Sequence, residues 1–171
     1  TSPDLLEYAR RAGALAVKLA CSENMRPRDI VTMESFENAI LVHAAISGST
    51  NCLLHLPAIA HEYGLTITGD TFDRLHRGAR YLLDVRPAGR WPAEFFYYAG
   101  GVPAIMEEIK AHLHLDAMTV TGKTLGENLE ELKREGFYER CQKWLEEANR
   151  KYGISIQRED VIRPYGKALG C

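Results

Sequence analysis

The chain has 171 residues, of which 46% are hydrophobic and 26% carry a charged side chain. This balance excludes a disordered chain and predicts one globular piece, residues 1–171 without an internal boundary, with a buried core. The formal net charge is −2, from 21 Lys and Arg against 23 Asp and Glu. With no basic excess and no run of ~18–20 apolar residues, we expect neither nucleic acid nor a membrane as a partner.

The first predicted element is a helix at the start of the chain. Ser2 suits its N-cap and Pro3 its first turn, and apolar residues then recur at helical spacing as far as Leu19. Two further helices, 36–46 and 52–60, are apolar on nearly every side. Helices of that kind are buried, so we expect both to lie in the core.

The middle of the chain predicts three short helices. Asp70 is placed to cap the first, which ends at Gly78. Residues 93–99 form an aromatic helix that two glycines terminate, and Pro103 opens the next one.

One strand and two helices are predicted beyond residue 117. Residues 118–121 are β-branched and form the best strand candidate. Thr124 and Glu127 fit a capping box, which opens a helix that ends before Gly136. The last helix runs from there to near Gly153. The predicted fold is therefore mainly α, with one or two short strands.

The four cysteines are spaced too widely for a zinc motif or a disulfide framework. We expect reduced thiols in a cytoplasmic protein, with three of the four packed in helices as small hydrophobic residues. The cysteines are Cys21, Cys52, Cys141 and Cys171.

The polar turn 47–51 is the first candidate for chemistry. It lies between two apolar helices, and the N-terminus of the second offers backbone N–H groups and a positive dipole to a carboxylate, a phosphate or a polyol. In the alternative interpretation, Ser and Asn in this turn only cap the two helices.

Gly122-Lys123-Thr124 invites comparison with a phosphate-binding P-loop, but Ala117 stands where that motif requires its first glycine. Nucleotide binding is therefore rejected. Lys123 stays a candidate for contacting an anion, with a solvated loop lysine as the alternative. Among other polar residues, His43 and His55 lie in apolar helices and are expected to be hydrogen-bonded core histidines. Arg86 and Arg90 could contact an anion or a partner's carboxylates, or simply lie on a surface loop.

Several motifs occur together in one order, and together they are specific. They resemble the dihydroxy-acid dehydratase and 6-phosphogluconate dehydratase family, most strongly over residues 27–128. Residues 91–115 resemble its sugar-acid branch, the D-xylonate-type aldonate dehydratases. The motifs are Arg26–Ile30, Phe36–Ala39, Ser47–Asn51, Leu54–Leu56, Ala58–Ala60, Arg86–Arg90, Ala99–Ala104 and Thr119–Asn128.

The resemblance implies a hydro-lyase that converts a sugar acid to a 2-keto-3-deoxy acid. It implies an iron–sulfur cluster, [2Fe–2S] or [4Fe–4S], as a Lewis acid on the leaving hydroxyl, with Mg²⁺ nearby. No cysteine here matches a cluster-ligand motif of the family. We therefore expect an internal segment of the α/β N-terminal domain, inactive alone, with no catalytic residue and no metal ligand.

Within this segment, the resemblance implies that Ser49, Thr50 and Asn51 shape the substrate pocket, with Lys123 and Thr124 as weaker candidates. The expected partners are a small sugar acid, the rest of the same polypeptide and further copies in a homo-oligomer. The alternative is a non-catalytic assembly module with an anion-binding helix N-terminus. In that case the aromatic run 95–98 and the apolar helices would serve association.

Overall fold

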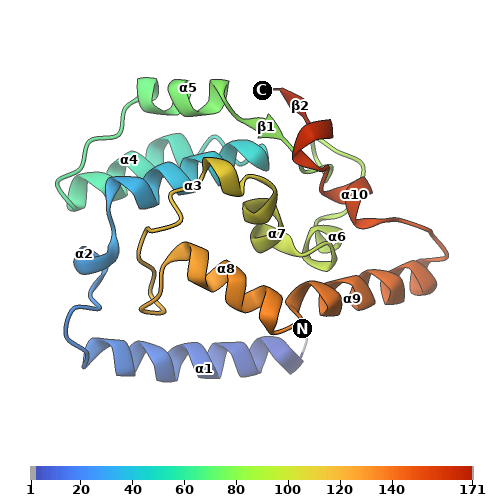
Figure 1. Ribbon diagram of the computed structural model, residues 1–171, viewed down its shortest axis with the longest axis horizontal. Coiled ribbons are helices and arrows are strands. Elements are labelled where there is room, and N and C mark those ends of the chain that lie inside the picture. The colour runs from blue at the N-terminus through green and yellow to red at the C-terminus, as the bar shows by residue number, and fades with distance from the viewer. Residues whose placement is uncertain (1–2, 171) are drawn as a thin grey trace.

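The computed structural model describes residues 3–170, with side chains from Leu5 to Gly170 (Figure 1). The predicted Ser2 cap lies outside the described residues. In this part of the chain, the fold is mainly helical with two short strands, as predicted. The helices are α1 (Pro3–Ala20), α2 (Pro27–Ile30), α3 (Met33–Ala45), α4 (Cys52–Glu62), α5 (Gly69–Arg77), α6 (Ala93–Tyr98), α7 (Gly101–Glu108), η1 (Lys110–His112), α8 (Leu125–Arg134), α9 (Phe137–Tyr152), α10 (Arg158–Val161) and η2 (Tyr165–Lys167); β1 (Arg80–Tyr81) pairs antiparallel with β2 (Leu169–Gly170).

Helix α3 lies at the centre of the fold and packs against α4, α5, α7 and β1 (Figure 1). Its N-terminal half supplies Phe36 and Ile40 to a small core with Ala60 of α4 and Phe72 of α5. Its C-terminal half supplies residues to the main core, which also draws on α6, α7, α9 and the tail. The two cores therefore meet along a single helix, and α3 is buried as predicted.

The polar side chains of α3 find partners in distant segments. Asn38 is 5% exposed; its amide nitrogen donates to the His114 carbonyl at 2.9 Å, and its oxygen accepts from the His114 N–H at 2.8 Å. The Glu37 carboxylate pairs with Arg74 of α5 at 2.7 Å and with His114 Nε2 at 2.8 Å. Two polar residues thus attach both α5 and the loop after η1 to α3, as burial requires.

The tail from residue 158 completes the main core, although its sequence shows little periodicity. Val161 and Ile162 have no exposed surface. Their backbone runs beside residues 82–85, where the Asp84 N–H donates to the Val161 carbonyl at 2.8 Å. Arg163 N–H in turn donates to the Leu82 carbonyl at 2.9 Å. Backbone pairing thus gives the tail a defined path.

Asp84 is a buried carboxylate at this junction, with 4% of its surface exposed. It accepts hydrogen bonds from the backbone N–H and from Nε of Arg90, both at 2.9 Å, and pairs with Arg163 at 3.1 Å. Burial alone raises the pKa of Asp84, but the bonds from Arg90 and the charge of Arg163 outweigh it and lower the pKa below its usual range. The charged form therefore stabilises the fold.

The prediction that helix 52–60 is buried is wrong. Within α4 only Ala60 is buried, whereas Leu53, Leu54 and Ile59 are 43%, 72% and 48% exposed. Helix α1 is exposed along most of its length, including Leu6 at 69% and Val17 at 68%. An apolar sequence predicts burial, but it does not say what covers the helix.

The predicted strand at 118–121 is also wrong. This segment forms a tight loop, in which Thr119 N–H donates to the Lys123 carbonyl at 3.0 Å and Gly122 N–H donates to the Thr119 carbonyl at 3.1 Å. Its β-branched residues face no partner strand, so the backbone bonds within the loop instead. Among residues 3–170, the structure contains no helix long and apolar enough to cross a bilayer.

Replacing Asp84 with Asn should lower the free energy of unfolding by about 2–4 kcal/mol, because it removes the charge that two arginines contact. Asp73→Asn, which breaks an exposed pair with Arg77 on α5, should cost below about 0.5 kcal/mol. Urea unfolding of both variants measures these two losses of unfolding free energy. Equal losses would contradict a stabilising role for the buried Asp84 carboxylate.

The contribution of Asp84 should also depend on pH. Its folded pKa lies below the unfolded value of about 3.9, so the stabilisation is complete above that value and is lost as pH falls through the folded pKa. The difference in unfolding free energy between the wild type and Asp84→Asn should therefore shrink below about pH 4. A difference that grows on acidification would mean that folding raises the pKa of Asp84 rather than lowering it.

Thr124→Ala should cost about 1 kcal/mol of stability. The predicted capping box is present: Glu127 N–H donates to Thr124 Oγ1 at 3.2 Å and Thr124 N–H donates to Glu127 Oε2 at 2.8 Å. Thr124→Ser keeps the oxygen and should unfold close to the wild-type temperature. Thermal unfolding of the two variants separates the cap from packing of the lost methyl group.

Candidate functional site

The turn 47–51 reverses the chain sharply between α3 and α4. Ser47 adopts a left-handed backbone conformation, with φ +51°. Gly48 N–H donates to the His43 carbonyl at 2.9 Å, which closes the end of α3. The turn that follows presents Ser49, Thr50 and Asn51 as exposed residues. The structure therefore brings these three predicted residues together at one surface.

The first backbone N–H groups of α4 are engaged within the turn itself. Asn51 N–H donates to Ser49 Oγ at 3.3 Å, and Cys52 N–H donates to the Ser49 carbonyl at 3.0 Å. Leu53 N–H donates to the Thr50 carbonyl at 3.0 Å. Asn51 is the N-cap residue of α4 but forms no side-chain cap bond, and Ser49 Oγ accepts only from Asn51 N–H, so the side-chain capping of the alternative interpretation is not formed at α4. What the turn offers to a ligand is its exposed hydroxyl and amide side chains rather than these three N–H groups.

Lys123 and Thr124 lie in a different part of the molecule. Their loop runs below the N-terminal half of α3, near the connection between α1 and α2, whereas the turn 47–51 lies at the opposite end of α3 (Figure 1). Lys123 Nζ contacts both carboxylate oxygens of Glu131 in α8, at 2.6 and 2.7 Å, and lowers the pKa of that group. The five predicted residues therefore form two separate groups, and the second is engaged in the capping and pairing of α8.

The prediction for the histidines is confirmed for one of the two. His43 is buried; its Nε2 lies 2.9 Å from the Ser49 carbonyl and its Nδ1 lies 3.4 Å from His76 Nε2. His55 is exposed on α4, so the prediction of a core histidine is wrong there. His76 was missed from the sequence, because nothing local links two histidines 33 residues apart.

Of the two arginines singled out, Arg90 has a structural role through Asp84 and lies over the Trp91 ring at 5.7 Å. Arg86 is exposed at the start of the same loop. Arg90 is therefore paired with Asp84 and stacked on Trp91, whereas Arg86 is a surface residue.

The described residues do not fit an iron–sulfur cluster or a magnesium ion. In residues 3–170, no three side chains of His, Cys, Asp or Glu come together as metal ligands. Cys21 is exposed after α1, Cys52 begins α4, and Cys141 is buried in α9. Burial raises the pKa of the Cys141 thiol, which makes it a poor thiolate ligand or nucleophile. Cys171 lies outside the described residues.

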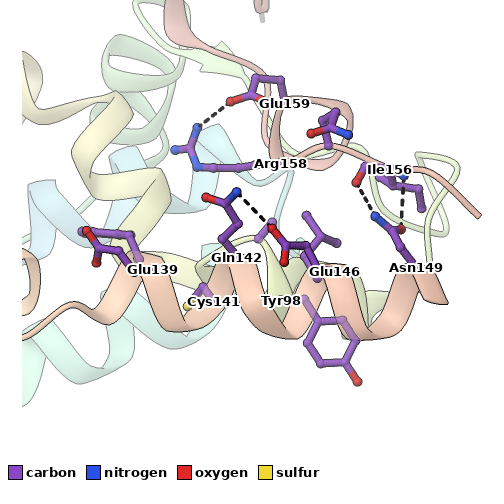
Figure 2. Close-up of a pocket in the computed structure, with 13 residues that line it drawn as sticks. Tyr98, Glu139, Cys141, Gln142, Glu146, Asn149, Ile156, Arg158 and Glu159 are labelled. Atoms are coloured by element: carbon purple, nitrogen blue, oxygen red, sulfur yellow. Dashed lines mark hydrogen bonds and ion pairs between the residues drawn. The ribbon is translucent and has the colours of Figure 1, made fainter. Parts of the chain in front are cut away.

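A cavity of about 440 Å³ lies between α9 and the segment 156–159 (Figure 2). Its polar residues bond mainly to one another. Gln142 Nε2 donates to Glu146 at 3.2 Å, and Asn149 forms two hydrogen bonds with the backbone of Ile156, at 2.8 and 3.1 Å. A ligand would have to break these bonds, so the turn 47–51 is the better candidate site.

The comparisons with known proteins agree with the motif analysis. The family model described as dihydroxy-acid/6-phosphogluconate dehydratase N-terminal matches residues 1–128. A dihydroxy-acid dehydratase of Methanosarcina acetivorans is 50% identical over 128 residues, and one of Solidesulfovibrio magneticus is 48% identical over 130 residues. Both alignments cover 75% of this chain and 23% of the relative.

A third relative, from Cytophaga hutchinsonii, is 48% identical over 111 residues, which are 64% of this chain and 20% of that protein. All three are named dihydroxy-acid dehydratases, so the family is confirmed, while the sugar-acid branch stays a prediction. The aligned part of the chain spans between a fifth and a quarter of the length of these relatives. The matched segment includes the turn 47–51 and the loop 118–124. The chain therefore belongs to the dihydroxy-acid/6-phosphogluconate dehydratase family, and its residues 1–128 match the N-terminal region of that family.

Proposed function

We propose that this chain is part of a hydro-lyase that removes water from a 2,3-dihydroxy carboxylic acid and yields a 2-keto acid. The observation that carries the proposal is the family match over residues 1–128, which contains the exposed polar turn. The cluster and Mg²⁺ that the family resemblance implies would supply the Lewis acid for the leaving hydroxyl. Because the described residues do not fit either group, we expect the ligands in the rest of the polypeptide.

In this proposal, Ser49, Thr50 and Asn51 contact the carboxylate and hydroxyl groups of the substrate. All three are exposed on one turn, and the Ser49 hydroxyl keeps its proton available while its oxygen accepts from Asn51 N–H. Hydrogen bonds from such groups to a carboxylate are charge-assisted and orient the acid. Lys123 and Thr124 are weaker candidates, because Lys123 would have to leave Glu131 to contact a substrate.

For the substrate class we propose a sugar acid of the aldonate type. The resemblance of residues 91–115 to sugar-acid dehydratases supports it, and an acid with several hydroxyls offers a partner to each polar side chain of the turn. The names of the relatives support a simpler dihydroxy acid instead. Formation of 2-keto acid from D-xylonate, compared with a 2,3-dihydroxy acid that lacks further hydroxyls, decides between the two.

The remaining partners are proposed as the rest of the same polypeptide and further copies in a homo-oligomer. The exposed leucines of α4 and the exposed apolar side chains of α1 support both, since apolar surface of this extent is normally covered. The same surfaces favour the second candidate function, a non-catalytic assembly module. Absence of 2-keto acid formation by the full-length, cluster-loaded protein, together with stable ligand-independent association, would support that alternative.

Ser49→Ala and Asn51→Ala in the full-length enzyme should each lower kcat/KM about 10- to 150-fold, because a charge-assisted hydrogen bond is worth about 1.5–3 kcal/mol. Ser155→Ala, which removes an exposed hydroxyl between α9 and α10, is the matched control. Steady-state assays of 2-keto acid formation measure the effect. Wild-type kinetics in both turn variants would exclude the turn from the site.

A further inference from the structure

The ring of His43 forms the inner surface of the turn. A Cβ atom built on Gly48 would lie 2.4 Å from His43 Cδ2 and 2.9 Å from its Nε2. Gly48 therefore packs its bare backbone directly on the imidazole, and no larger residue fits without moving the ring. His43 is 9% exposed, so the turn is built against a buried residue from the last turn of α3.

The hydrogen bonds around His43 define its tautomer. The Ser49 carbonyl can only accept, so the 2.9 Å contact requires a proton on His43 Nε2. A neutral ring then has a bare Nδ1, which accepts from His76 Nε2–H at 3.4 Å. The two rings lie nearly parallel, with an angle of 23° between their planes and centroids 5.4 Å apart. His76 thus supports the one tautomer of His43 that can bond the turn.

The surroundings of His76 suit this role. Its ring meets Phe72 edge-on, with centroids 5.8 Å apart, so its orientation is set by packing within α5. Burial and the neighbouring His43 lower the pKa of His76, while Asp73 opposes the shift. With its proton on Nε2, the neutral His76 ring can donate to His43 Nδ1.

We propose that His43 is a positioning residue, which fixes the shape of the turn 47–51 for substrate through its Nε2–H bond to the Ser49 carbonyl, with His76 selecting the tautomer. The inference rests on the proposed function, because the turn must contact substrate for its shape to matter. The hydrogen bond holds the turn on its buried side, while the side chains of Thr50 and Asn51 lie on the exposed side. Activity would thus depend on a ring that never touches the substrate.

A pair of variants separates the two ring nitrogens. Gln places its amide N–H near the position of Nε2, so His43→Gln keeps a donor for Ser49. Asn places its amide near Nδ1, so His43→Asn keeps a partner for His76 and loses the bond to the turn. In the full-length enzyme, His43→Asn should lower kcat/KM about tenfold, mainly through KM, and His43→Gln should stay within roughly threefold of wild type.

Two measurements accompany the kinetics. Amide hydrogen exchange at Asn51, Cys52 and Leu53 should accelerate in His43→Asn and stay near wild type in His43→Gln. The ¹⁵N spectrum of the wild type should show a protonated Nε2 and a bare Nδ1 at His43. Gly48→Ala, whose added methyl group would displace the Cδ2–Nε2 edge of the ring, should reproduce the His43→Asn exchange pattern, whereas Gly69→Ala, with open space around its Cβ, should not.

The inference is overturned if the Asn and Gln variants match each other in both kinetics and exchange, or if Nδ1 carries the proton. If Ser49→Ala and Asn51→Ala lose activity while the His43 variants stay alike, the inference fails and the proposed function stands. If the turn variants keep wild-type kinetics while the His43 pair still differs in exchange, the proposed site fails and the role of His43 in shaping the turn is supported.

Discussion

The burial of α3 is the constraint on which the rest of the structure depends. A helix enclosed on most sides cannot leave its polar side chains unpaired, because each would lose its bonds to water without replacement. Asn38 and Glu37 therefore bind the loop at His114 and the side of α5, and His43 binds the turn that follows the helix. These internal bonds determine where three surface segments lie.

The two ends of α3 consequently serve different purposes. Near its N-terminus, Glu37 and Asn38 attach α5 and the loop at His114, which leads to the N-cap of α8. At its C-terminus, His43 Nε2 contacts the turn 47–51. This turn presents the exposed polar side chains of Ser49, Thr50 and Asn51 and lies within the segment that the family model matches. The candidate site is thus anchored to a buried side chain of the core, an arrangement that suits a binding site with defined geometry.

Local signals predicted most of the helices, because caps and helical spacing act within a few residues. The Thr124 box and the terminating Gly136 and Gly153 are examples. The N-cap of α5 is Thr68, whereas the sequence predicts Asp70, so the helix begins about half a turn earlier than predicted. Contacts between segments far apart in the sequence could not be predicted from local signals. Examples are the missing partner strand for 118–121, the exposure of α4, and the contact between His43 and His76. The polar turn was found because small polar residues between two apolar helices are conspicuous, whereas the histidine that supports it looked like any core residue.

The tail also bears on where the folding unit ends. The family match stops at residue 128, but Leu145, Val161 and Ile162 share one core with Leu82, Phe95 and Ile105 of the matched segment. A chain cut at the edge of the sequence match would open that core to water and leave the Asp84 carboxylate without Arg163. The segment matched by the family is therefore shorter than the segment whose side chains share this core, and a boundary drawn at residue 128 would divide a single hydrophobic interior.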